Sequence, residues 1–443
     1  MQLNKQDKKA HKTKMPNKMK IAEKLAIAAT ALIGSSVQGQ ENEAEWDFAI
    51  SAFGYSETDR VSAGELIFTA DKDYDDSAHL SYKILFDSLT GSSANGAIAQ
   101  NTPQTFTRVS ANGQYTTEAS DTPVDPNYRD SRGQFSMSWS DALSVDSRYT
   151  VGGNLSKEID YTSIGINGEY AKDFNQRNTT LSIGTSFGVD TFEPLGGLPI
   201  ALSSMVVNNG QFASETDFLN AYDATKGDTS DTITTSELLL GWTQVINRRT
   251  VMQLNYGFAN ISGYLTDPYK IVSRVDNSGI TQDLTYENRP DSKTQHSVFG
   301  LVKHHLDNSV VDVSYRYVTN DFGIKSHTID SHWLFYVDEG NFWQPHIRFY
   351  QQAAADFYTP FLAQENPLPE FVSADYRIGD MTAVTLGLKY GFQMDDGDRA
   401  EIRLEYYKQT PTSANEPQGI ANLEGLDLYP EVDAVILQFN YYF

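Results

Sequence analysis

The end of the chain carries the feature that most constrains its fold, a strict alternation of apolar and polar side chains. Val435, Leu437, Phe439, Tyr441 and Phe443 fall on one face, and Gln438 and Asn440 fall on the other. A period of two indicates a β-strand with a different environment on each side. Segments of about 10 to 14 residues with this period recur from Trp46 onward, separated by Asp, Asn, Gly, Ser and Pro.

The remaining composition favours a membrane barrel over a membrane helix. Beyond the N-terminal region no apolar run approaches the roughly 18 to 20 residues that a membrane helix needs. Strands that alternate lipid-facing and lumen-facing side chains average out on a hydropathy scale, and the mean hydropathy is −0.44. Tyr (25) and Phe (23) are plentiful, as expected at a membrane interface. The pattern therefore predicts an all-β fold, a transmembrane antiparallel β-barrel.

Sixteen alternating segments can be placed, with fourteen as the alternative count. They are 46–56, 61–71, 77–89, 132–141, 145–156, 161–172, 178–190, 232–246, 250–263, 294–306, 309–320, 325–338, 341–353, 381–394, 399–409 and 430–443.

The lengths of the connections support this count. The long connections all follow odd-numbered segments, and every connection after an even-numbered segment is short; the long ones are 90–131, 191–231, 264–293, 354–380 and 410–429. Outer-membrane barrels have short periplasmic turns and long extracellular loops. We therefore expect periplasmic termini, with residues 372–379 forming either an extra strand or part of a loop.

The N-terminal region is typical of a secretory signal. Lys18, Lys20 and Lys24 precede a short apolar stretch, 25–33, and small residues follow up to Gly39. The sequence predicts a cleaved signal peptide over 1–39 and a single barrel domain over 40–443, with Met15 or Met19 as alternative starts. The chain has no cysteine, which excludes a lipid-anchored cysteine after the cleavage site and a thiolate metal site.

The charge balance excludes nucleic acid as a partner. The formal net charge is −24, and removal of 1–39, with its eight lysines and two acids, leaves 26 basic and 56 acidic residues, a net charge of −30. Such a surface repels nucleic acid. It suits divalent cations or cationic solutes, although general acidic solvation explains it equally well. The expected partners are outer-membrane lipid, lipopolysaccharide and the outer-membrane assembly machinery, which would read Phe439, Tyr441 and Phe443 in the last strand.

Charged side chains on one face of five predicted strands are candidates for a lumen or selectivity wall. They are Asp312, Arg316, Asp330, His332, His346, Arg348, Lys389, Glu401, Arg403 and Glu405. Imidazoles near carboxylates can bind a transition metal, but the histidines lack the spacing of ligands on a single element. Charged groups on the wall of an aqueous lumen are the alternative reading.

A short acidic run is a weak candidate for a divalent cation. Asp71, Asp73 and Asp75 alternate like the start of a calcium loop, yet Asp76 stands at the sixth position and Tyr82 at the twelfth, where Gly and Glu are expected. A solvated acidic turn is the alternative. We expect no cofactor beyond a loosely bound divalent cation.

One stretch resembles a known family. It contains Glu57, Asp59 and Arg60, then the run from Asp87 to Ala97, and later 104–107; the run includes Asp87, Leu89, Thr90, Gly91, Asn95, Gly96 and Ala97. This is similar to an uncharacterised family of bacterial outer-membrane barrels catalogued as a domain of unknown function. Members show Phe-Asp-Leu-Thr-Gly-Ala-Ser-Pro-Asn-Gly here, whereas this chain departs at Ser88 and Ala94. The resemblance implies a barrel, assigns no activity and leaves open a periplasmic redox partner.

Read physically, this motif begins the first long loop, where Gly91 and Gly96 can adopt positive φ and Asn95 can cap a turn. A tight structural loop is favoured over a ligand site.

Three functions follow from these observations. The first is a porin-like passive or loop-gated channel for small solutes, since about sixteen strands enclose an aqueous lumen. The second is a barrel scaffold that houses or docks a periplasmic or surface partner protein. The third, an outer-membrane hydrolase, lacks a supporting motif, so we expect no enzyme. With about six residues between the expected cleavage site and the first strand, no plug domain is expected, and a blocked lumen would require loop 90–131, loop 191–231 or another protein.

Overall fold

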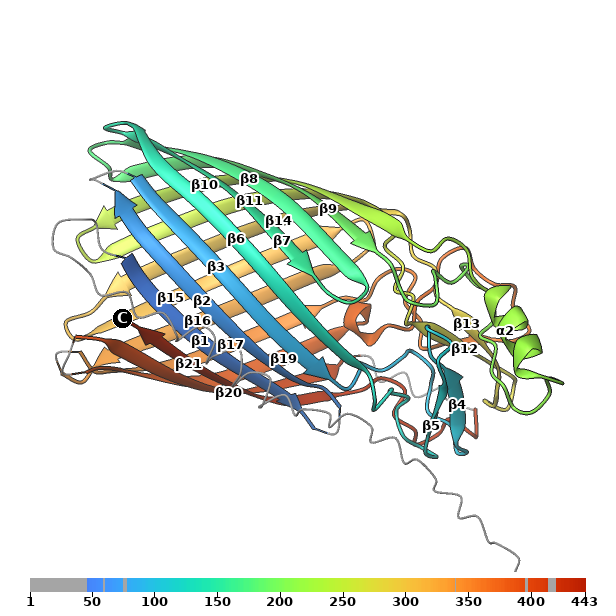
Figure 1. Cartoon of the computed structure of the whole chain (residues 1–443). Coiled ribbons are helices and arrows are strands. Elements are labelled where there is room, and N and C mark those ends of the chain that lie inside the picture. The colour runs from blue at the N-terminus through green and yellow to red at the C-terminus, as the bar shows by residue number, and fades with distance from the viewer. Residues whose placement is uncertain (1–45, 59, 75–77, 339, 395–396, 413–419) are drawn as a thin grey trace, which may run out of the picture.

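The computed structural model describes residues 46–58, 60–74, 78–338, 340–394, 397–412 and 420–443, and these form a closed barrel (Figure 1). Within this part of the chain the barrel has sixteen strands. They are β1 (Trp46–Glu57), β2 (Ser62–Tyr74), β3 (Ala78–Thr90), β6 (Arg129–Ser144), β7 (Ser147–Lys157), β8 (Tyr161–Phe174), β9 (Thr179–Phe192), β10 (Asp231–Asn247), β11 (Thr250–Gly263), β14 (Ser292–His305), β15 (Ser309–Asn320), β16 (Lys325–Tyr336), β17 (Phe342–Gln352), β19 (Met381–Gln393), β20 (Arg399–Pro411) and β21 (Val432–Tyr442).

Each barrel strand pairs antiparallel with its neighbour along the chain, and β21 closes the ring against β1. Ala52 lies opposite Phe439 at this seam, and Phe48 and Phe443 exchange backbone hydrogen bonds of 2.9 and 3.0 Å. The rings of Phe48 and Phe443 stack with centroids 5.7 Å apart. Closure leaves no strand edge unpaired, which lipid requires because it offers no hydrogen-bond partner.

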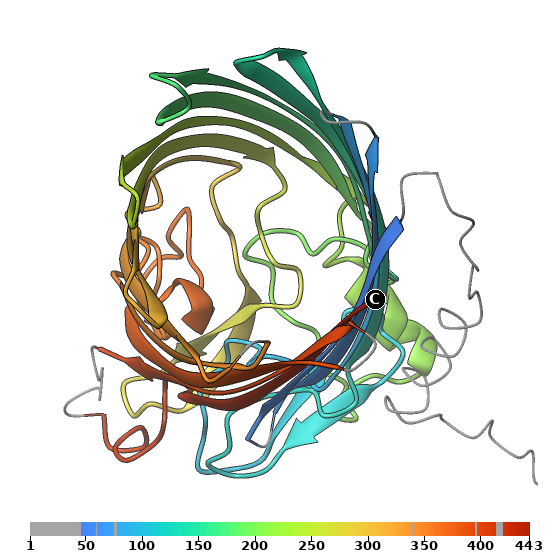
Figure 2. The same cartoon turned by 90° about the vertical axis from the view of Figure 1, so that its left-hand side faces the viewer.

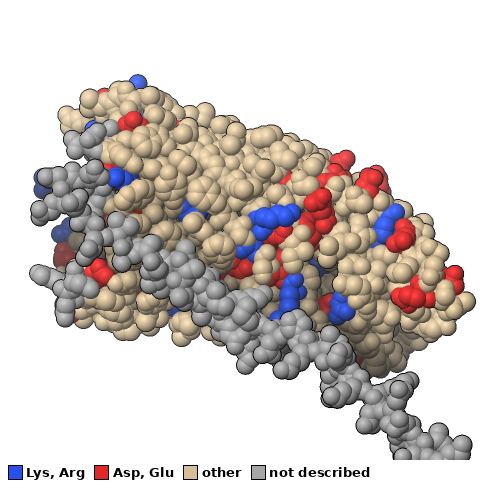
Figure 3. Space-filling view, viewed as in Figure 1, with Lys and Arg blue, Asp and Glu red and all other residues tan. Residues whose placement is uncertain are grey.

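The alternation of the sequence becomes an apolar outer wall. Leu437, Leu404 and Leu386 are more than half exposed although they lie in the middle of strands, and Ile166 and Ile347 are more than half exposed elsewhere on the ring. Exposed leucine and isoleucine at regular spacing are expected where the solvent is lipid. On the face seen in Figure 3, the wall of the barrel is largely uncharged between the turn end and a band of charged side chains near the middle of the molecule, and further charges lie toward the cap.

The long connections all leave the same end of the barrel, where they carry structure of their own (Figure 1). Their elements are β4 (Gln104–Thr107), β5 (Gln114–Thr117), α2 (Glu215–Asp223), β12 (Ile271–Val275), β13 (Thr281–Tyr286), β18 (Phe361–Ala363) and the 3-10 turn η1 (Tyr376–Ile378). β4 pairs with β5, and β12 lies between β13 and β18 in a small sheet. We call the described residues of 91–128, 193–230, 264–291, 353–380 and 420–431 the loop cap.

The loop cap packs onto the inner face of the barrel. Tyr55, Tyr350 and Tyr407 stand on the same faces of their strands as the inward-pointing side chains, and they pack against a core that includes Tyr376 and Tyr429 of the cap. Gln352 of β17 also donates hydrogen bonds to the carbonyl oxygens of Arg377 (3.1 Å) and Gly379 (2.8 Å). Seen along the barrel from the turn end, segments of the cap cross the outline of the far opening (Figure 2).

The structure confirms the fold class, the count of sixteen and the placement of all long connections at one end. Strand ends differ by a few residues: β6 begins at Arg129 rather than 132, and β21 begins at Val432 rather than 430. Residues 372–379 belong to a loop that contains η1, not to an additional barrel strand. The expected signal peptide, 1–39, lies outside the described residues. Among the described helices, none is long and apolar enough to cross a membrane.

A charge placed on the outer wall tests which face meets lipid. Leu437→Arg should lower the free energy of unfolding by about 2–4 kcal/mol, because a guanidinium near the middle of the bilayer is poorly solvated. Gln438→Arg is the matched control. Gln438 is the next residue along the strand, and its side chain points to the lumen and donates a hydrogen bond to Asn440. Urea unfolding of the folded barrel in lipid vesicles gives both values. Equal losses in the two variants would contradict the assignment of the faces.

Candidate functional site

The sequence-predicted lumen residues lie on five consecutive barrel strands, β15, β16, β17, β19 and β20. Their side chains alternate with exposed apolar residues such as Val313, Ile329 and Leu404, which face outward. Arg316 lies over the ring of Phe299, 5.4 Å from its centroid, and Arg348 stands opposite Asp330 in the strand register. The residues chosen from the alternating pattern therefore lie on one continuous stretch of the inner wall.

Four of these residues form a compact cluster, which we call the histidine cluster: Asp330, His332, His346 and Glu405. The two imidazole rings stack in parallel, with centroids 4.3 Å apart and planes inclined by 4°. His332 Nδ1 lies 3.3 Å from Asp330 Oδ1 and 3.1 Å from Asp312 Oδ1. His346 lies between two acids, with Nε2 3.2 Å from Asp330 Oδ2 and Nδ1 2.8 Å from Glu405 Oε1.

The wall continues as a ladder of ion pairs on β19 and β20. Lys389 Nζ lies 3.4 Å from Glu401 Oε2, and Arg403 Nη1 lies 3.5 Å from Glu405 Oε1. Glu401 also accepts a hydrogen bond of 3.3 Å from the Asn440 side chain. Acids and bases thus alternate along this wall rather than forming a surface of one sign.

A second charged group lies on the inner face of β2, β3 and β6. Arg132 Nη2 is 2.5 Å from Asp87 and 3.9 Å from Glu65. The three side chains line a cavity of about 360 Å³ together with Asp130 and Glu158. Sequence reasoning did not single out Glu65 or Arg132. The alternation of β6 could have identified Arg132. This residue lies on the same polar face as Gln134, and Phe135 lies on the opposite face.

The family-like motif forms the exit of β3 and the start of the loop cap. Gly91 has φ +80° and Gly96 has φ +96°; a Cβ on Gly96 would lie 2.2 Å from the carbonyl oxygen of Ile271. Asn95 Oδ1 accepts the backbone N–H of Ala97 at 2.8 Å, and Asn95 Nδ2 donates to Tyr115 at 2.9 Å. The expected positive φ values and turn cap are present. Leu89 and Thr90 form the last residue pairs between β3 and β6.

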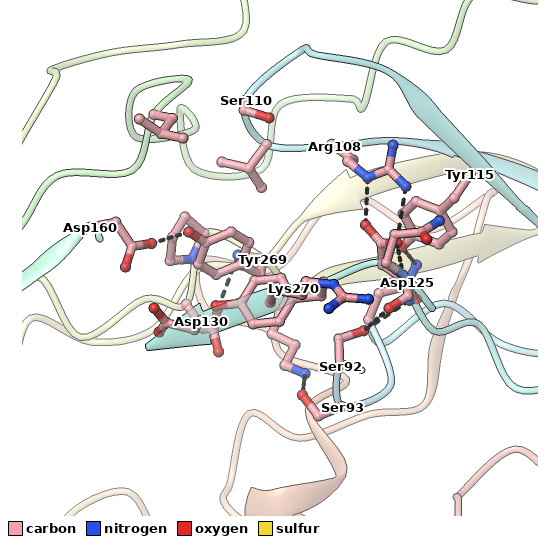
Figure 4. A pocket seen from close by; sticks show the side chains of 18 of the residues that line it. Ser92, Ser93, Arg108, Ser110, Tyr115, Asp125, Asp130, Asp160, Tyr269 and Lys270 are labelled. Carbon is pink, nitrogen blue, oxygen red and sulfur yellow. Dashed lines mark hydrogen bonds and ion pairs between the residues drawn. The ribbon is translucent and has the colours of Figure 1, made fainter. Parts of the chain in front are cut away.

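The motif also lines a cavity of about 490 Å³ (Figure 4). Ser92 and Ser93 face Tyr269 and Lys270, which come from the connection between β11 and β14. Lys270 Nζ donates to Ser93 Oγ at 2.7 Å, and Arg108 pairs with Asp125 at 2.7 Å. The lining combines both signs of charge with hydroxyl groups. Its chemistry can hydrogen bond a polar solute but does not select one sign of charge.

A buried ion cluster joins two connections of the loop cap: Lys270, Glu287, Arg289 and Asp375. Arg289 Nη2 donates to Asp375 at 2.9 Å and to Glu287 at 3.1 Å. Burial lowers the pKa of Lys270, against the opposing effect of Asp375. Burial alone would raise the pKa of Asp375, but Lys270 and Arg377 hold it below its usual range. These groups stabilise one another in a largely buried site, and no sequence period marks them.

The acidic candidates for a cation lie elsewhere. Asp71 and Asp73 are in β2 rather than in the following turn, and His79 of β3 contacts both, at 3.6 Å and 2.7 Å. Asp75 lies outside the described residues. The run is therefore paired across two strands and does not form a calcium loop in the part that the structure describes.

The closed ring, its apolar outer belt and its charged inner wall define an integral β-barrel of the outer-membrane type. The chain belongs to the family described as protein of unknown function (DUF3570), which matches residues 22–443. No curated protein matches the chain.

Among solved structures, the chain is similar to a bacterial polysaccharide outer membrane secretin, with 11% identity, a TM-score of 0.42, and coverage of 90% of this chain and 97% of that chain. It is also similar to OccK2 (OpdF) of Pseudomonas aeruginosa in complex with glucuronate, with 9% identity, a TM-score of 0.40 and coverage of 91% and 99%. The siderophore receptor PirA of Acinetobacter baumannii is 9% identical, with a TM-score of 0.41 and coverage of 84% of this chain and 54% of that chain. Because these scores are low, the ligands of those proteins say nothing about this chain.

Loss of the buried ion cluster should loosen the cap without opening the barrel. Asp375→Asn removes one of the two carboxylates that pair with Arg289 and the acid that most offsets the charge of Lys270, which should cost about 3–5 kcal/mol of cap stability. Cleavage of the cap by trypsin through local opening should then accelerate by about 100-fold or more. The heat-dependent gel mobility of the folded barrel should not change.

The control for this experiment is Asp307→Asn, which removes an exposed ion pair with Arg249 and should have little effect. Because the pKa of Asp375 is depressed, its stabilisation is present above about pH 4 and is lost as the pH falls toward the folded-state value. Equal cleavage rates for the two variants would contradict a role of the buried ion cluster in holding the cap closed.

A second prediction concerns Glu158, between β7 and β8. Burial, followed by the neighbouring Asp130 carboxylate, raises the pKa of Glu158 to about 7. The side chain is therefore neutral below this pH and negative above it, so the cation preference measured from reversal potentials should increase from pH 6 to pH 8. Glu158→Gln should flatten this step, whereas Glu118→Gln, on an exposed loop, should keep it. A step of unchanged size in Glu158→Gln would assign the titration to another group.

Proposed function

We propose that this protein is a channel for small polar solutes that is gated by its own loops. The observation that carries the proposal is a closed sixteen-stranded barrel with a charged inner wall, one end of which is packed with its own loop cap. Barrels of about sixteen strands leave an aqueous lumen when nothing fills it. Passage through this one would require displacement of the cap.

The inner wall supports a preference for small charged or zwitterionic solutes. Four acids and four bases occupy the predicted lumen positions; the acids are Asp312, Asp330, Glu401 and Glu405, and the bases are Arg316, Arg348, Lys389 and Arg403. Lys389 pairs with Glu401 and Arg403 with Glu405. Paired groups of this kind replace part of the hydration shell of a solute while it moves. The overall excess of acid adds a bias toward cations.

The test is single-channel recording in a planar bilayer with the wild type and with Asp375→Asn. A gated channel should show brief open steps in the wild type and longer openings in the variant, whose cap is loosened. Asp307→Asn should behave as the wild type. A folded barrel that is silent in all three forms would reject the channel.

Charge reversal identifies the selectivity wall. The double variant Arg316→Glu, Arg348→Glu should shift the reversal potential toward cations, because it replaces two positive groups on the inner face by two negative ones. Arg249→Glu replaces one arginine by glutamate at an exposed turn outside the lumen, and this variant should leave the ion selectivity unchanged. Unaltered selectivity in the double variant would exclude this wall as the filter.

The second candidate is a scaffold that docks a partner protein. The observation in its favour is a group of exposed apolar side chains on the cap segment 193–230, where Leu195 is 75% exposed and Ile200 and Leu219 are also accessible. A stoichiometric partner recovered from native membranes, lost on Leu195→Ser, would support docking there. Persistence of the complex in this variant would place the contact elsewhere.

We further propose that the chain sits in the outer membrane with periplasmic termini and with the loop cap outside, in contact with lipid and lipopolysaccharide. The short turns and the C-terminus lie at the end opposite the cap, as such an orientation requires (Figure 1). Phe439, Tyr441 and Phe443 stand in the closing strand, where recognition by the assembly machinery would precede pairing with β1.

A further inference from the structure

The histidine cluster brings together side chains from three strands. Asp330 and His332 project from β16, His346 projects from β17, and Glu405 projects from β20. His332 and His346 are direct partners in the register of β16 and β17. The side chains are partly accessible from the lumen, with exposed fractions of 23% for Asp330, 31% for His332 and 11% for His346.

The donor set has the separation that a metal ion requires. One ligand atom each from Asp330, His332 and His346 lies within 4.8 Å of the others. The two histidine nitrogens approach the Asp330 oxygens to 3.3 Å and 3.2 Å. Two ligand atoms on a tetrahedral ion, each about 2.0–2.2 Å from it, are themselves about 3.3 Å apart. The cluster is thus close to a coordination geometry before any ion enters.

Both ring nitrogens of His346 face acceptors, which a neutral imidazole cannot satisfy. A neutral imidazole has one N–H donor and one lone pair. Both nitrogens of His346 nevertheless face carboxylates, Glu405 and Asp330. If Nδ1–H donates to Glu405, the lone pair of Nε2 is directed at an Asp330 oxygen. Either a second proton or a metal ion between Nε2 and Asp330 relieves this repulsion.

Glu405 acts as a positioning residue in this arrangement. Histidine ligands of metals commonly donate their other N–H to a carboxylate, which fixes the tautomer and increases the basicity of the ligand nitrogen. The 2.8 Å contact from His346 Nδ1 to Glu405 supplies that partner. Arg403, 3.5 Å from the same carboxylate oxygen, holds Glu405 in turn.

We propose that Asp330, His332 and His346 form a binding site on the lumen wall for a divalent first-row transition-metal cation such as Zn²⁺, Ni²⁺ or Cu²⁺. Two imidazoles and one carboxylate favour these ions over Mg²⁺ and Ca²⁺, which prefer oxygen ligands. The remaining coordination positions face the lumen and are open to water or to a passing solute. Because the rings are parallel in the structure, at least one must rotate about its side-chain torsion to aim its lone pair at the shared ion, and His332 is the more exposed of the two.

The experiment is metal binding by the purified, folded barrel, prepared without a polyhistidine tag. Zn²⁺ is titrated calorimetrically in the presence of excess Mg²⁺, and Co²⁺ is added separately so that its visible absorption reports nitrogen and oxygen ligands. The wild type should bind one Zn²⁺ per barrel. Asp330→Asn and the double variant His332→Gln, His346→Gln should each weaken binding by 100-fold or more, whereas Glu405→Gln should weaken it by about 10–100-fold.

Two control variants distinguish this site from other histidines. His327→Gln removes an exposed histidine on the outward face of β16, which hydrogen bonds to Tyr315. His79→Gln removes the histidine beside Asp71 and Asp73. Both should retain wild-type affinity. A wild type that binds no more Zn²⁺ than the double variant, or a loss of binding in either control, would overturn the proposal; the Co²⁺ spectrum of the wild type remains decisive where a cluster variant fails to fold.

Discussion

The structure depends on the need to pair every backbone N–H and C=O group that lies in lipid. The seam between β1 and β21 satisfies this need, because it converts a sheet with two free edges into a ring with none. Once the ring is closed, each strand has one face toward lipid and one toward the lumen, and only the outer face is obliged to be apolar. The inner face is free to carry charge, which is why Glu401 and Leu404 can stand three residues apart on one strand. The chemistry of this protein therefore lies on the inner wall and in the loops.

The same constraint explains what the sequence could predict. Alternation and turn residues were sufficient to place sixteen strands and to sort the long connections to one end, since each strand must present its period of two to lipid. The prediction was less accurate where strands extend beyond the membrane. Arg129 and Asp130 pair with Thr90 and Leu89 in the structure but carry no apolar alternation, so the predicted segment began too late, at 132. The alternation along each strand predicted which face a lumen residue occupies. It did not predict which side chains on other strands that residue contacts.

Contacts between distant segments account for the rest. Arg289 meets Asp375 across 86 residues of sequence, and no period or spacing marks such a pair. The histidine cluster shows a related limit, because spacing along one element was the criterion for metal ligands and the proposed ligands lie on adjacent strands. His332 and His346 become neighbours only through the register of β16 and β17. A blocked lumen was expected to require loop 90–131, loop 191–231 or another protein. In the structure, the segments 353–380 and 420–431 contribute to the inward-packing core together with 91–128.

The cap and the inner wall follow different electrostatic rules, and this difference separates their roles. Lys270 and Asp375 are almost fully buried, so each depends on its partners and the cluster is stable only as a complete set. The side chains of Arg316 and Arg348 border a wet lumen, where individual charges are solvated and can exchange partners with a solute. A structure that must open needs a cooperative contact that is either made or lost, whereas a wall that must let solutes pass needs weak and replaceable contacts. The buried ion cluster has the first property and the exposed side chains of Arg316 and Arg348 have the second. In the proposed channel, gating therefore belongs to the loops and selectivity to the strands.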